Sequence, residues 1–161
     1  MKNFTIVLGV LIVAGLVAGT AFGQAAPEKA IKSYVETLRK DIRTQKQSLV
    51  DQGMGLDAAQ KSQFWTIYNN YQTELNVIGD QRVANMKKYA ENFDKMTDAT
   101  ADQLAAKMLD IEGQRTTLKK KYYAAFKEKM GARVAARFLQ VETMLNAFID
   151  LQLGSELPIL Q

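Results

Sequence analysis

The chain of 161 residues contains no cysteine and no histidine. Without cysteine it cannot form a disulfide, a thiolate nucleophile, a sulfur-ligated zinc site or a lipid-modified N-terminal cysteine. Without histidine it lacks the commonest general base near neutral pH and the commonest metal ligand. Most hydrolase, oxidoreductase and zinc chemistry would therefore have to run on carboxylates and lysines alone. We expect a protein that is not an enzyme, with no catalytic residue, no cofactor and no metal site.

Proline is almost as scarce, since only Pro27 and Pro158 are present. The 130 residues between them lack the strongest helix breaker. Hydrophobic residues make up 47% of the chain, which is typical of a globular protein and not of a disordered one. The length suits one domain. Composition therefore predicts a single, mostly helical domain.

The first residues resemble a secretory signal peptide. Lys2 precedes an apolar run over residues 4–18, and small residues follow it up to Gly23. We expect cleavage after Gly23, so that residues 1–23 are the signal peptide, residues 24–161 are the mature domain and the location is the periplasm. An uncleaved N-terminal anchor is the alternative, because residues 4–22 approach the ~20 residues that span a bilayer.

Apolar residues recur at steps of three and four along the mature chain, which predicts amphipathic helices. We expect four, over residues 27–50, 57–95, 100–130 and 134–153. Gly131 either separates the last two or only kinks one longer helix. The predicted fold is all-α: a long antiparallel helical hairpin with shorter flanking helices, forming an open bundle. The apolar stripes expected to face its core include Leu49, Phe64, Tyr68, Tyr71, Ile78, Met108, Ile111, Leu118, Tyr122, Phe126, Phe138, Leu145 and Phe148.

Two sequences have the form of a helix N-terminus. Asp57 follows Leu56, and Gln60 lies three residues further on, which is a capping-box arrangement. Thr100 and Gln103 form a similar pair, so we expect Thr100 to cap the third helix. Gly53 and Gly55 stand between the first two helices and are expected to end the first.

Charge is divided unevenly along the second half of the chain. Residues 91–112 hold two basic and six acidic residues, whereas residues 113–141 hold eight basic and one acidic residue. The basic block is either a solvated helix face or a cationic, partly aromatic surface for acidic or unfolded partners. The candidate partner-binding residues are Lys119, Lys120, Lys121, Tyr123, Lys127, Arg133 and Arg137.

Two arginines interrupt the apolar stripes and need a partner. Arg82 and Arg115 come close together if the second and third helices fold back on each other near residue 98. Two neighbouring cations require a shared acid, for which Glu112 is the first candidate and Asp80 the second. A structural ion pair that sets the helix register is the favoured interpretation, and a ligand site is the alternative.

The segment Leu56–Gln60 resembles the Leu-Thr-x-x-Gln motif of the Spy/CpxP-like periplasmic proteins, with Asp57 in place of the threonine. The order of a signal peptide, a short helix, a long hairpin and a last helix agrees with this resemblance over residues 27–154. A second copy of the motif would fall near residues 130–134, where the sequence departs from it. The resemblance implies an all-α homodimer whose concave face binds unfolded clients without ATP.

Two functions follow as expectations. The first is an exported, ATP-independent, chaperone-like protein that binds unfolded or envelope proteins through an apolar helical surface fringed by basic residues. The alternative is a non-catalytic structural or regulatory envelope protein that docks on one specific partner. We expect no nucleic-acid partner, since export removes a basic protein from cytosolic nucleic acid. Binding to a membrane surface is an open alternative that we do not predict.

Overall fold

The computed structural model describes residues 45–155, which lie within one compact unit, Arg39–Gln161. The predicted signal peptide, most of the predicted first helix and the C-terminal tail lie outside the described residues. Side-chain burial is described for residues 45–151. The domain boundary after residue 23 therefore stays a prediction.

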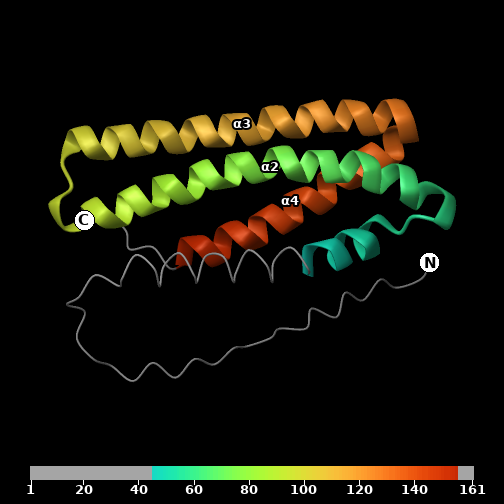
Figure 1. Cartoon of the computed structure of the whole chain (residues 1–161), viewed down its shortest axis with the longest axis horizontal. Coiled ribbons are helices and arrows are strands. Elements are labelled where there is room, and N and C mark those ends of the chain that lie inside the picture. The colour runs from blue at the N-terminus through green and yellow to red at the C-terminus, as the bar shows by residue number, and fades with distance from the viewer. Residues whose placement is uncertain (1–44, 156–161) are drawn as a thin grey trace, which may run out of the picture. The chain divides into compact units, whose positions relative to one another are not determined.

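The described residues are helical and include no strand. Residues 45–54 form a short helix, which is followed by α2 (Ala58–Asn92), the 3-10 turn η1 (Phe93–Lys95), α3 (Asp98–Met130) and α4 (Ala132–Ser155). In Figure 1, α2 and α3 run side by side in opposite directions as a long hairpin, and α4 folds back beside it. The all-α prediction with a long antiparallel hairpin is confirmed.

The helix ends follow local capping chemistry. Asp57 accepts a hydrogen bond from the Gln60 backbone N–H at 2.8 Å, as predicted for the start of α2. The prediction for the third helix was wrong, because its N-cap is Thr97 and not Thr100. Thr97 has an extended backbone, and its Oγ1 accepts from the Thr100 N–H at 3.2 Å, so Thr100 already lies inside the first turn.

Glycines separate the helices where the backbone turns. Gly55 has a φ of +54° and its N–H bonds to the Asp51 carbonyl at 3.1 Å, which ends the short first helix. Gly131 has a φ of +88° and separates α3 from α4, so the last two helices are distinct. Gly53 permits a close approach to α4, since a Cβ there would lie 2.9 Å from a Val141 methyl group.

The buried core is confined to one half of the hairpin. We call residues 58–78 and 111–130 the proximal half of the hairpin, and residues 79–110 the distal half. No residue of the distal half is buried. The core of the described chain joins the proximal half to α4 and to the short first helix; its apolar members are Val50, Met54, Phe64, Tyr68, Tyr71, Ile78, Ile111, Leu118, Tyr122, Phe126, Ala135 and Phe138.

Three residues that we expected to face the core are about half exposed. They are Leu49 in the short first helix, Met108 in α3 and Phe148 in α4. Met108 belongs to the distal half, in which none of the described residues is buried. Phe148 lies on the face of α4 that turns away from Glu142 and Asn146, two polar residues that occupy the core side instead. The side of α4 that faces the core therefore differs from the predicted one by a rotation of part of a helical turn.

Candidate functional site

The predicted basic surface lies on α3 and the start of α4. Lys120, Lys121, Lys127, Arg133 and Arg137 are exposed, whereas Lys119 is half-buried and Tyr123 packs against the core. Two of these cations contact other described residues. Lys121 forms an ion pair with Glu74, and Arg137 donates a hydrogen bond to the Met54 carbonyl at 2.9 Å. Four cations of this block have no polar partner among the described residues: Lys119, Lys120, Lys127 and Arg133.

Lys121 belongs to a small cluster across the hairpin. Its Nζ donates to both oxygens of Glu74, at 2.6 and 2.7 Å, and the Tyr122 hydroxyl donates to the same carboxylate at 2.7 Å. The hydrogen bonds from Lys121 and then Tyr122 lower the pKa of Glu74. Burial, followed by the hydrogen bond to Glu74, raises the pKa of Tyr122 to about 12. Lys121 therefore helps to join α3 to α2, and it is a weaker candidate for partner binding than its neighbours.

The outward face of α4 carries a row of large apolar side chains and, within residues 132–151, no exposed acidic residue. Met144, Phe148 and Leu151 follow one another at steps of four and three, and their exposed fractions are 64%, 52% and 72%. Within residues 132–151, the acidic residues of α4 are Glu142 and Asp150, and both contact other helices. The outward face of α4 is left with apolar side chains, with the uncharged polar Gln140 and Thr143, and with two arginines near its start.

Glu142 is the centre of a buried polar network that we did not predict from the sequence. Its side chain is fully buried and accepts from Tyr68 Oη at 2.5 Å and from Tyr71 Oη at 2.9 Å. Lys46 Nζ lies 3.2 Å from the same carboxylate, and Asn146 Nδ2 donates to it at 3.5 Å. The network therefore ties α2, α4 and the short first helix together.

The network perturbs its titratable members in opposite directions. Burial lowers the pKa of Lys46, although Glu142 acts to raise it. Burial and then the Glu142 charge raise the pKa of Tyr68 and of Tyr71 well above the ordinary tyrosine value. These groups have hydrogen-bond partners and lie inside the core, where a substrate has no access. We therefore interpret this cluster as structural.

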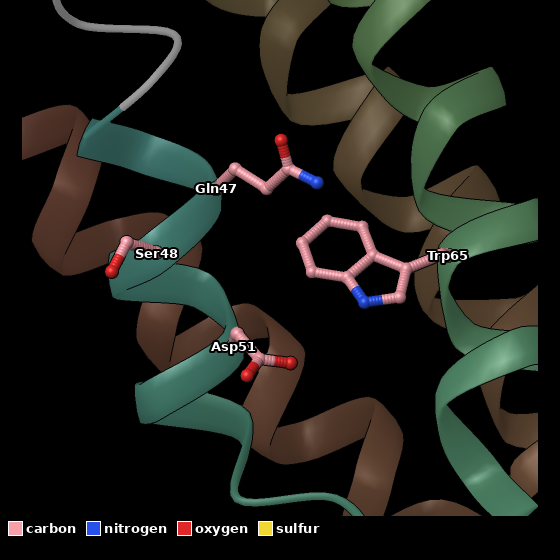
Figure 2. A pocket seen from close by; sticks show the side chains of 4 residues that line it. All are labelled: Gln47, Ser48, Asp51 and Trp65. Atoms are coloured by element: carbon pink, nitrogen blue, oxygen red, sulfur yellow. The ribbon is translucent and has the colours of Figure 1, made fainter. Parts of the chain in front are cut away.

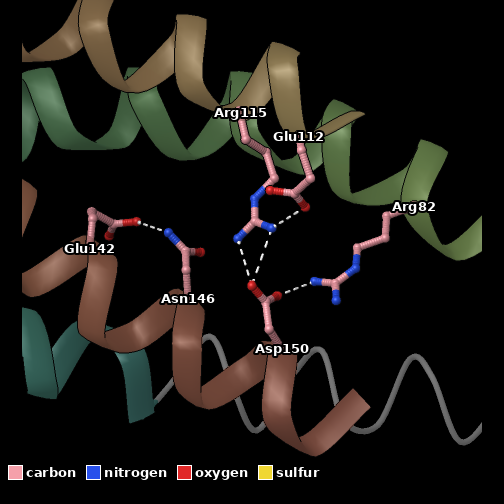
Figure 3. Close-up of polar contacts among 6 residues, drawn as sticks. All are labelled: Arg82, Glu112, Arg115, Glu142, Asn146 and Asp150. Carbon is pink, nitrogen blue, oxygen red and sulfur yellow. Dashed lines mark hydrogen bonds and ion pairs between the residues drawn. The ribbon is translucent and has the colours of Figure 1, made fainter. Parts of the chain in front are cut away.

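A second polar cluster joins the end of α4 to the hairpin (Figure 3). Asp150 contacts both Arg82 and Arg115, with 3.4 Å to each of two guanidinium nitrogens of Arg115. Glu112 lies 2.7 Å from Arg115 Nη1. Burial opposes the charge on Arg115, but Glu112 and Asp150 outweigh it and raise its pKa. The arginines do lie close together, but the acid that contacts both is Asp150 of α4, whereas Glu112, the first candidate, pairs with Arg115.

A shallow hollow lies between the short first helix and α2 (Figure 2). It encloses about 360 Å³, and the Trp65 indole faces it from α2 while Gln47, Ser48 and Asp51 line the other wall. Asp51 Oδ2 already accepts from Lys61 at 2.8 Å, and Ser48 accepts from Gln52. The polar groups of the hollow are therefore partly satisfied by neighbouring side chains.

Neither a metal-binding cluster nor a membrane-spanning helix is found in the described part of the chain. Residues 45–155 hold no group of three or more acidic side chains placed to bind a metal ion. None of the helices in this range is both long enough and apolar enough to cross a bilayer. The strongest surface feature is therefore the exposed apolar face of α4 together with the unpaired cations of α3 and α4.

Comparison with known proteins gives no match: no protein-family model, no curated protein and no solved structure matches this chain. The resemblance of Leu56–Gln60 to the Spy/CpxP-like motif stays a prediction. In this structure Leu56 packs against the core, and Asp57 caps α2, so the motif residues act at a helix start.

The sequence contained a weak sign of the residues that we missed. Glu142 and Asn146 lie at the four-residue spacing that places them on the same face as Phe138, where apolar residues are expected. Asp150 continues the same series. A run of polar residues at helical spacing within an apolar pattern indicates a buried network, but their partners on α2 and α3 are far away in the sequence.

Proposed function

We propose that this protein is an exported, ATP-independent, chaperone-like protein that binds unfolded or envelope proteins. The observation that carries the proposal is the composition of the outward face of α4, where Met144, Phe148 and Leu151 are exposed and no acidic side chain is exposed within residues 132–151. Monomeric soluble proteins seldom expose rows of large apolar side chains unless these bind something.

The unpaired cations support the same proposal. Lys119, Lys127 and Arg133 lie on the same helix pair as the apolar row, and long basic side chains offer both an alkyl stem and a charge. Unfolded chains present apolar residues interspersed with carboxylates. A surface with both features binds such chains without nucleotide or catalysis, and export is supported by the signal-like sequence of residues 1–23.

The test measures light scattering while several unrelated proteins aggregate, with this protein at near-stoichiometric ratio. The wild-type protein is expected to suppress the scattering of all of them. The triple variant M144S/F148S/L151S should lose most of this effect, whereas the control V77S should keep it, because Val77 is also exposed but lies on α2. Circular dichroism checks that the variants remain helical.

A second variant tests the contribution of charge. K119E/R133E reverses two cations that have no polar partner among the described residues, and it should weaken client binding while the bundle remains folded. Binding that is unchanged in both variants would remove this surface from the proposal. Capture of one envelope protein, without suppression of general aggregation, would favour the alternative in which the protein docks on a specific partner.

A further inference from the structure

The hollow between the short first helix and α2 has an aromatic wall and a polar wall (Figure 2). The aromatic wall is the indole of Trp65, the only tryptophan in the chain. Figure 2 shows this indole on its flat face, with the Gln47 amide on one side of it and the Asp51 carboxylate on the other. Ser48 also lines the hollow, but its hydroxyl is turned away from the indole. The hollow therefore presents one flat apolar surface flanked by two polar groups.

The indole is held in place by the buried core beneath it. Its ring centroid lies 5.4 Å from that of Phe64 and 5.4 Å from that of Tyr68, two residues that are fully buried. Both rings stand nearly perpendicular to the indole, at 81° and 88°, so neither of them stacks parallel on its flat face. Trp65 itself is half-buried. A side chain fixed in this way is ordered before a ligand arrives, which lowers the entropic cost of binding.

Three polar groups of the hollow keep hydrogen-bonding capacity that residues 45–155 do not use. Asp51 Oδ2 accepts from Lys61 at 2.8 Å, whereas Asp51 Oδ1 has no partner among these residues. The Gln47 amide and the Trp65 Nε1–H have no hydrogen-bond partner within the same range. Together they offer an anionic acceptor, an indole donor and an amide that both donates and accepts. A ligand in the hollow can therefore be held by hydrogen bonds of both kinds.

Charge decides which class of ligand these groups fit. Because Asp51 is paired with Lys61, this wall carries no net charge, and a cationic ligand would have to compete with the lysine. An anionic ligand would meet the Asp51 carboxylate and the negative face of the indole. A wholly apolar ligand would cover Asp51 and Gln47 without offering them a partner. The ligand that satisfies the hollow is neutral, with a flat face of C–H groups and hydroxyl groups around its edge.

We propose that this hollow binds one pyranose ring of a neutral carbohydrate. The C–H face of the sugar ring stacks on the Trp65 indole, its hydroxyl groups donate to the Asp51 carboxylate, and the Gln47 amide bonds to the opposite edge of the ring. The hollow encloses about 360 Å³, near the lower end of the ~300–1,000 Å³ found for ligand sites, which suits a single ring. A free sugar and one ring of a glycan chain present the same chemistry to these residues.

The test uses the fluorescence of Trp65, which reports directly on the hollow because the chain has no other tryptophan. The protein is titrated with glucose, with N-acetylglucosamine and with the linear tetrasaccharide of each. We expect a saturable change in emission with a dissociation constant of about 1 mM for a single ring, since so small a ligand makes few contacts. Tighter binding of a tetrasaccharide would identify a glycan chain as the source of the ring, and equal or weaker binding a free sugar. Sorbitol, which carries hydroxyl groups but no ring, should cause no change.

Single substitutions assign the contacts. Gln47→Ala and Asp51→Ala should each weaken sugar binding by about 5-fold, the usual effect of losing one hydrogen bond. The matched control Gln63→Ala removes an exposed glutamine of α2 that does not line the hollow, and it should leave binding unchanged. Trp65→Ala removes the fluorophore, so its binding is measured by saturation-transfer NMR, where a loss of at least 10-fold is expected. Circular dichroism checks that each variant remains helical.

The proposal does not depend on client binding, because the hollow is formed by the short first helix and α2, whereas the exposed apolar row lies on α4. The variant M144S/F148S/L151S should therefore bind sugar as the wild type does. Neither a fluorescence change nor an NMR signal with any of these sugars up to about 100 mM overturns the proposal. It is equally overturned if sorbitol binds as well as glucose, if Q47A and D51A both bind like Q63A, or if tetramethylammonium chloride binds more tightly than every sugar.

Discussion

The two halves of the α2–α3 hairpin have the same helical structure but are stabilised differently. The proximal half contributes Phe64 and Phe126 to a dense aromatic core. The ring centroids of Phe64 and Phe126 lie 5.1 Å apart, and those of Phe126 and Phe138 of α4 lie 4.6 Å apart. The distal half contains no buried residue. It is joined by hydrogen bonds instead, such as the one from Asn85 Nδ2 to the Leu104 carbonyl at 3.1 Å.

This difference shows that helix length and fold stability are separate properties. Regular capping and the absence of proline suffice to continue α2 and α3 past the core. The free energy of unfolding comes chiefly from apolar burial, which needs the additional layer that α4 and the short first helix supply in the proximal half. The distal half therefore depends on the proximal half, and substitutions in the two halves should have different consequences.

The largest expected effect concerns the buried carboxylate of the proximal half. Glu142→Leu removes the acceptor shared by Tyr68, Tyr71 and Lys46, and it leaves a buried ammonium without its partner. We expect the free energy of unfolding to fall by about 3–5 kcal/mol, measured by urea denaturation. Glu142→Gln keeps an acceptor and should cost less.

The double variant K46M/E142L sharpens this test. It removes both charges together, and apolar replacement of a buried ion pair is often neutral. It should therefore recover much of the stability that E142L loses. A double variant as unstable as E142L would show that the two tyrosine hydroxyls, and not the charge on Lys46, account for the loss.

The second effect is a loss of stability in alkali. Tyr68 and Tyr71 have raised pKa values in the folded protein, so above pH ~10 the unfolded chain releases protons that the folded chain keeps. The contribution of these two tyrosines to the free energy of unfolding is therefore fully present below pH ~10 and is lost as the pH rises further. Lys46 acts oppositely, because its lowered pKa makes folding more favourable as the pH approaches ~10.5.

Urea denaturation at a series of pH values measures this dependence. Above pH ~10.5 the tyrosines dominate, and stability should fall with rising pH. Tyr71→Phe removes one of these groups and should make the fall shallower by about one proton, apart from its own loss of a hydrogen bond. A pH dependence that is identical in wild type and Y71F would show that Tyr71 ionises equally in both states.

The third effect is a difference in local opening between the two halves. We expect backbone amides of residues 79–110 to exchange with solvent through openings of much lower free energy than those around Phe126, since few apolar contacts must break. Native-state hydrogen exchange at several low concentrations of denaturant measures the free energy of opening in both halves. Equal protection in the two halves would mean that the hairpin opens only as a single unit.

The sequence predicted the helices because their signals are local. Apolar spacing, Asp57 and the glycines at 55 and 131 each act within one or two turns, and they placed α2 and α4 within a few residues. The polar clusters were predicted less well, because they depend on contacts between distant segments. Arg82 and Arg115 were expected to share an acid, but Asp150 lies 68 and 35 residues away from them, and only the docking of α4 brings it there.

The start of α3 shows the limit of a local signal. Thr97 and Thr100 are both threonines, and each is followed three residues later by a polar residue. The spacing does not distinguish them. The choice depends on where the 3-10 turn after α2 ends, since Thr97 is the threonine left in an extended conformation. The same ambiguity made Phe148 look like a core residue, because only the position of the neighbouring helices decides which side of α4 is covered.

The smallest effect compares the two caps. Asp57→Ala and Thr97→Ala each remove a hydrogen bond to the third backbone N–H of the following segment, and each should cost about 1 kcal/mol of local helix stability. Asp57 begins α2 beside the core, so the cost of removing its hydrogen bond should appear in full as a lower free energy of unfolding in urea. Thr97 lies at the tip of the distal half, so its loss should appear mainly as faster amide exchange near residue 100. The conservative changes Asp57→Asn and Thr97→Ser keep the acceptor and should have little effect. Equal losses of global stability from the two alanine variants would contradict the division of the hairpin, because they would mean that the tip unfolds only together with the core.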